Sequence, residues 1–113
     1  MENIADKIHA GFLYGAAGRT LVDLTANNSM YQMKDGDRVI HINAMVEGVI
    51  YLPSTVGASG NFYSLTSLSQ SNNNANLYTR EKETLIISLP RCTTALYYCD
   101  GLCWYEIDMI LKS

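Results

Sequence analysis

The sequence has few charged residues and no long apolar run. Only 17% of its 113 residues are Asp, Glu, Lys or Arg, against roughly 25% in an average soluble domain, whereas 48% are hydrophobic. Charge this scarce predicts that part of the surface is buried against other subunits. The apolar runs are far shorter than the roughly 18 residues that span a bilayer, and the polar start Met1-Glu2-Asn3 is unlike a secretion signal. We therefore expect a protein made in a cytoplasm, outside any membrane.

Basic residues are also scarce. Eight Lys and Arg leave a net charge of −3, and they are scattered singly, with no cluster beyond residues 80–82. Affinity for nucleic acid comes mainly from neutralising phosphates with Lys and Arg. The sequence therefore argues against DNA or RNA as a partner.

Signatures of catalysis are missing as well. There is no Gly-x-Ser-x-Gly nucleophile elbow, and residues 57–60 lack the Lys-Ser/Thr of a phosphate-binding loop. The aspartates at predicted turns, such as Asp37 and Asp100, are expected to bond to the local backbone rather than to form an acid–base pair in a cleft. His41 lies between Ile40 and Ile42 and suits a packed or interfacial role better than that of a base. We predict no enzyme activity and no cofactor.

The cysteines do not form a metal-binding pattern. Cys92, Cys99 and Cys103 are three in number, and the two histidines are far away in the sequence, whereas zinc sites commonly use closely spaced pairs that supply four ligands. Cys99 and Cys103 flank a tight turn, so a disulfide across it stays open as an alternative. Free structural thiols are the favoured interpretation, and we predict no metal site.

The sequence is rich in short strand-like segments bounded by Gly, Pro, Asn and Asp. The clearest cover residues 39–43, 49–52, 62–67, 84–89, 95–99 and 103–107, and weaker ones cover residues 20–24, 30–33 and 77–79. The Asp-Gly pairs of residues 34–37 and 100–101 predict tight hairpin turns that need a positive φ. Short strands with no helical stretch between them predict an all-β fold, a small antiparallel sandwich or barrel.

The length of the chain allows one domain with a short arm outside it. We assign residues 19–113 to a single β domain. Residues 1–18 are expected to form an N-terminal arm, irregular or a short helix, because Gly11, Gly15 and Gly18 each cost a helix about 1 kcal/mol relative to alanine.

Apolar strands and aromatic residues point toward assembly. Residues 49–52 and 84–89 are apolar on both faces, and a small sandwich has only one interior, so the second face predicts contact with another subunit. Tyr63, Trp104 and Tyr105 are the candidate binding aromatics. Two interpretations stay open: they fill a core or subunit interface, where Tyr and Trp are enriched, or they form an exposed platform on which a glycan stacks. The first is favoured.

Five motifs, in this order, resemble a module of phage tail fibres, virion spikes and capsid decoration proteins. They are DRVIxIN (37–43), VIYLP (49–53), GNFYxL (60–65), LII (85–87) and CDGxxWYEI (99–107). Together they cover residues 37–107, about two thirds of the chain.

The resemblance implies a small jelly-roll-like β domain that trimerises about a three-fold axis. It also implies a structural role in a virion, as a capsid decoration, cementing or spike protein. Residues 1–18 would then be the attaching arm, and the partner would be the major capsid protein or another virion protein. The alternative is a carbohydrate- or receptor-binding tip of a tail fibre. The chain departs from the fibre proteins in having no long shaft, which favours the decoration role.

Overall fold

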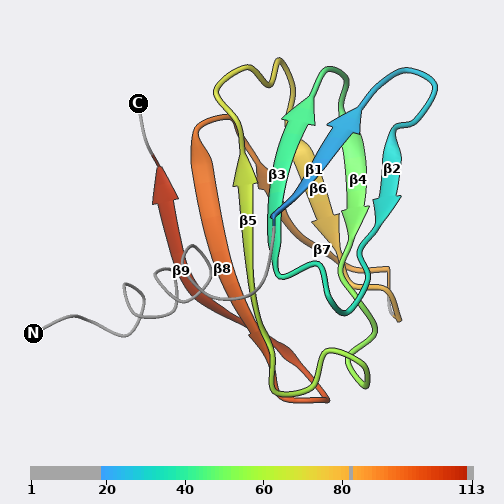
Figure 1. The fold of residues 1–113 in the computed structure, drawn as a ribbon, viewed down its shortest axis with the longest axis vertical. Coiled ribbons are helices and arrows are strands. Elements are labelled where there is room, and N and C mark those ends of the chain that lie inside the picture. Colours follow the sequence, from blue (N-terminus) through green and yellow to red (C-terminus); the bar gives the residue numbers. More distant parts are fainter. Residues whose placement is uncertain (1–18, 82, 112–113) are drawn as a thin grey trace, which may run out of the picture.

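The computed structural model describes residues 19–81 and 83–111, which form nine β-strands (Figure 1). The strands are β1 (Arg19–Leu24), β2 (Met30–Gln32), β3 (Val39–Ala44), β4 (Gly48–Tyr51), β5 (Phe62–Ser67), β6 (Ala75–Tyr78), β7 (Leu85–Leu89), β8 (Thr93–Cys99) and β9 (Trp104–Leu111). The all-β class is therefore confirmed. The strand ends agree with the predicted ranges to about two residues, except that β9 continues to Leu111. The expected N-terminal arm lies outside the described residues.

The strands form two mixed sheets. The first has the order β1-β3-β5-β8-β9 and the second the order β2-β4-β6-β7. From β1 to β6 the chain alternates between the sheets, and each strand from β3 to β6 pairs in parallel with the strand two places earlier. Only the last pairings, β5–β8, β6–β7 and β8–β9, are antiparallel. The expected antiparallel sandwich is wrong for the other four pairings.

The turn at residues 34–37 shows why the expectation failed. It does form a turn, since the Asp37 N–H donates to the Lys34 carbonyl at 3.0 Å. However, it joins β2 of one sheet to β3 of the other, so it is no hairpin, and Gly36 has no positive φ. The second predicted turn is confirmed, because Gly101 has a φ of 100° and joins the antiparallel strands β8 and β9.

The core lies between the two sheets. Alternate residues of each strand point inward, as period-two patterning requires. The fully buried aliphatic side chains include Leu24, Ile40, Ile42, Ile50, Leu65, Leu77 and Leu89. The described residues contain no helix, and so none that is long and apolar enough to cross a membrane.

Three connections meet at one end of the sandwich, at the bottom of Figure 1. The loop of residues 54–61 binds the β8–β9 hairpin through two backbone hydrogen bonds, from Gly60 N to the Cys99 carbonyl and from Cys99 N to the Asn61 carbonyl. The Tyr63 hydroxyl donates to the Asp35 carbonyl at 2.7 Å and ties the third connection to the same group. This end of the molecule is therefore held together by two backbone hydrogen bonds and one from the Tyr63 side chain.

Gly48 supports the alternation between the sheets. A Cβ at this position would lie 2.5 Å from the Ser29 carbonyl oxygen and 2.9 Å from a Leu24 methyl group. Gly48→Ala should therefore lower the free energy of unfolding by about 1–3 kcal/mol, as overpacking does, measured by urea denaturation. Gly36→Ala is the matched control, because a Cβ at that position would meet no atom within 4 Å. Equal stabilities of the two variants would contradict the close approach of β4 to residue 29.

Candidate functional site

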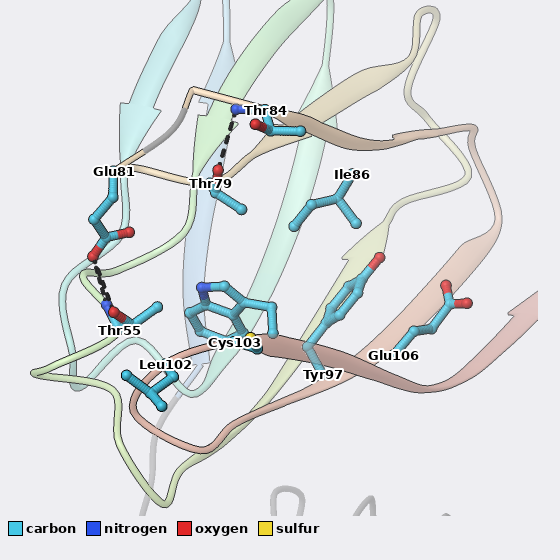
Figure 2. A pocket seen from close by; sticks show the side chains of 10 residues that line it. Thr55, Thr79, Glu81, Thr84, Ile86, Tyr97, Leu102, Cys103 and Glu106 are labelled. Atoms are coloured by element: carbon cyan, nitrogen blue, oxygen red, sulfur yellow. Dashed lines mark hydrogen bonds between the residues drawn. The ribbon is translucent and has the colours of Figure 1, made fainter.

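The first sheet has one strand more than the second, and this difference opens a cavity. The two sheets face each other strand by strand, from β1 opposite β2 to β8 opposite β7. β9, at the edge of the first sheet, therefore has no facing strand among the described residues. The cavity between β7 and the β8–β9 hairpin has a volume of about 510 Å³. Its lining residues are Thr55, Thr79, Glu81, Thr84, Ile86, Tyr97, Leu102, Cys103, Trp104 and Glu106 (Figure 2). This volume falls within the range of about 300–1,000 Å³ typical of small-ligand sites.

Two buried hydrogen-bond donors line the cavity without a partner. Tyr97 is 1% exposed, and its hydroxyl has no hydrogen-bond partner among the described residues; the same is true of the buried indole Nε1 of Trp104. In Figure 2 the Tyr97 ring extends from its strand toward Ile86, with the hydroxyl at the far end. Burial, and then the negative charge of Glu106, raises the pKa of the Tyr97 hydroxyl. Tyr97 is therefore protonated and a donor at neutral pH.

Two carboxylates lie at opposite sides of this cavity. Glu106 is the cross-strand neighbour of Tyr97, and it is exposed. Glu81 accepts hydrogen bonds at Oε1 from the Thr55 N–H, at 2.8 Å, and from the Thr55 hydroxyl, at 3.3 Å. Slight burial opposes ionisation of Glu81, but these hydrogen bonds outweigh it and lower its pKa. Glu81 is therefore an anionic acceptor at neutral pH.

Asp100 shapes the hairpin that carries Trp104. Its Oδ1 accepts hydrogen bonds from the Leu102 and Cys103 N–H groups, each at 2.8 Å, and its Oδ2 accepts from the Tyr105 hydroxyl at 2.9 Å. The bond from Cys103, then that from Leu102, holds the pKa of the Asp100 carboxyl below its usual value. Asp37 likewise accepts from the Lys34 N–H at 2.9 Å. The expected backbone-bonding role of turn aspartates is confirmed for both residues.

The structure does not bring the three candidate aromatics together at one surface. Tyr63 is fully buried and packs edge-on against Trp104, with ring centroids 5.4 Å apart. Trp104 is half-buried and lines the cavity. Tyr105 is 48% exposed on the other face of β9, where it continues a row with Tyr98 and Phe62. Of the three, Trp104 alone lines the cavity.

The cysteines are free thiols. Cys99 is buried, Cys92 is half-buried and Cys103 is exposed, and burial raises the pKa of the Cys99 thiol. Across residues 19–81 and 83–111, no three His, Cys, Asp or Glu side chains lie close enough together to hold a metal ion.

The outer face of the second sheet carries no charge. Strands β2, β4, β6 and β7 contain no Asp, Glu, Lys or Arg. The register places two cross-strand rows on this side, and we call them the uncharged face: Met30, Val49, Asn76 and Ser88, then Gln32, Tyr51, Tyr78 and Leu85. Met30 is 59% and Leu85 48% exposed, and the rings of Tyr51 and Tyr78 are 6.0 Å apart. Charged residues begin at its rim, at Glu47 and Arg80.

Sequence reasoning missed Tyr97 and Glu106 as cavity residues. The available signal was the period-two pattern of the last hairpin, which places Tyr97, Glu106 and Trp104 on one face of the sheet.

Comparison of the chain with family models, with curated proteins and with solved structures found no match.

Proposed function

We propose that this protein is a structural protein of a virion, a capsid decoration, cementing or spike protein that acts through trimerisation and protein–protein contacts. It would be made in the host cytoplasm and finish in the particle. The observation that carries the proposal is the uncharged face. Interface cores are depleted in charged residues and enriched in Tyr and Met relative to other surfaces, and this face combines Tyr51 and Tyr78 with the exposed side chains of Met30 and Leu85.

The occupant we assign to this face is a second copy of the chain. Both Met30 and Leu85 lie on edge strands of the sheet, so the apolar side chains extend over its whole width rather than forming one small patch. A polar rim around an uncharged centre is the usual anatomy of a subunit interface. Closed symmetry prevents open-ended stacking of such a face, and the three-fold axis is taken from the resemblance to decoration and spike modules. The jelly-roll topology that the resemblance also implies is not needed for this role.

Light scattering on the purified full-length protein tests the proposal. We expect a mass three times that of the 12.6-kDa chain at micromolar concentration, because a face of this composition is stabilised by burial of apolar area. We also expect the trimer to co-sediment with capsid shells assembled from the major capsid protein. A stable monomer that binds no shell would contradict both the trimer and the decoration role.

A further inference from the structure

The cavity between β7 and the β8–β9 hairpin has the chemistry of a ligand site that the virion role does not require. Its two buried donors, the Tyr97 hydroxyl and the Trp104 Nε1–H, have no partner among the described residues. Buried polar groups in proteins are nearly always hydrogen-bonded, and an unpaired one is costly. An occupant that offers acceptor oxygens to both donors would remove this cost.

The carboxylates set a second requirement. Glu106 lies across the strand pair from Tyr97, and Glu81 accepts hydrogen bonds from Thr55 at Oε1. A carboxylate is an acceptor only, so the occupant must also donate hydrogen bonds. Two negative charges at the cavity also disfavour an anionic ligand.

The walls set a third requirement. Ile86, Leu102 and the Trp104 ring give the cavity apolar surfaces, against which a ligand needs an apolar face. A hydrocarbon would leave both donors unpaired, and a quaternary ammonium ion offers no acceptor to them. A neutral sugar ring meets all three requirements, because its hydroxyl groups both donate and accept and its C–H face packs against an apolar wall.

We propose that this cavity binds one neutral pyranose ring of a saccharide. The apolar C–H face of the ring lies against Ile86 and Leu102, its hydroxyl oxygens accept from the Tyr97 hydroxyl and the Trp104 indole N–H, and a hydroxyl hydrogen bonds to Glu106, the cross-strand neighbour of Tyr97. Tyr105, on the opposite face of β9, takes no part.

Trp104 is the one tryptophan of the chain, so its fluorescence reports directly on the cavity. We expect methyl glucoside, methyl galactoside or methyl N-acetylglucosaminide to change the emission of the isolated full-length protein with a Kd of about 1 mM. Methyl glucuronide differs from methyl glucoside by a carboxylate, and it should bind about fivefold more weakly because of repulsion by Glu81 and Glu106. Glu106→Gln should reduce the difference in affinity between methyl glucoside and methyl glucuronide.

Tyr97→Phe removes only the unpaired hydroxyl, so the fold should be kept while affinity for the neutral glycoside falls about three- to tenfold. Tyr98→Phe is the matched control, because Tyr98 is the next residue of β8 and points to the other face; its affinity should equal that of the wild type. The proposal is overturned if no neutral glycoside changes the Trp104 emission. It is also overturned if choline or hexanol binds in place of sugar, or if Tyr97→Phe binds like the wild type.

This inference does not rest on the virion role, because the titration uses the isolated protein. A monomer that binds methyl glucoside would refute the proposed trimer and support the sugar site. A trimer whose fluorescence responds to no glycoside would support the proposed trimer and refute the sugar site.

Discussion

Replacing Tyr63 by alanine is expected to lower the free energy of unfolding by about 4 kcal/mol or more, enough to unfold a marginally stable domain. Tyr63 is fully buried, and truncation of a large buried aromatic costs about 3–5 kcal/mol. The variant also loses the hydrogen bond from the hydroxyl to the Asp35 carbonyl, worth about 1 kcal/mol. Urea denaturation followed by circular dichroism measures the loss.

Two further variants separate the contributions to that loss. Tyr63→Phe keeps the ring, its edge contact with Trp104 and the Arg38 guanidinium 5.7 Å from the ring centroid, so it should cost only about 1–2 kcal/mol. Tyr105→Ala removes an aromatic ring that is 48% exposed on the outer face of the same sheet and should cost less than Tyr63→Phe. If Tyr63→Ala is no less stable than Tyr105→Ala, Tyr63 is not a core residue.

The strands were predictable because their signals are local. Period-two alternation in residues 39–43 and 84–89, with Pro53 and Pro90 at strand ends, depends only on neighbouring residues. The Asp100-Gly101 turn was predictable for the same reason, since a glycine accepts the positive φ without steric cost.

The pairing of the strands was not predictable in the same way. A turn such as residues 34–37 has the same residue types whether it returns the chain to its own sheet or leads it into the other one. The choice depends on which apolar faces pack together across the whole sandwich. The alternation of β1 to β6 between sheets, and hence their parallel pairing, is therefore a non-local property.

The cavity depends on non-local features too. It exists because five strands face four, a difference that no segment of the sequence carries alone. Trp104 was identified as a candidate from its residue type, whereas Tyr97 lies in the apolar run of residues 95–99 and there looks like an ordinary core aromatic. Only the register between β8 and β9 brings it beside Glu106.

Introducing a positive charge on the uncharged face is expected to convert the proposed trimer into monomers. Tyr51 lies on a central strand of that face, beside Tyr78. Tyr51→Lys would place an unpaired ammonium group in a desolvated interface, which costs several kcal/mol, and a trimer bears this cost in each subunit. Light scattering should then give the 12.6-kDa mass of one chain.

Ser88→Lys tests the same face at small cost to the monomer, because Ser88 is exposed in the isolated chain and its side chain makes one described hydrogen bond, from its hydroxyl to Asn76 Oδ1 at 2.6 Å. It should also dissociate the trimer while the circular dichroism spectrum stays that of a β protein. Val56→Lys is the matched control: Val56 is 81% exposed in the loop of residues 54–61 and belongs to neither row of the uncharged face, so this variant should remain trimeric. If Ser88→Lys and Tyr51→Lys stay trimeric, the subunits meet through another surface. If all three variants dissociate, the fall in molecular mass from trimer to monomer reflects general destabilisation rather than a change at this interface.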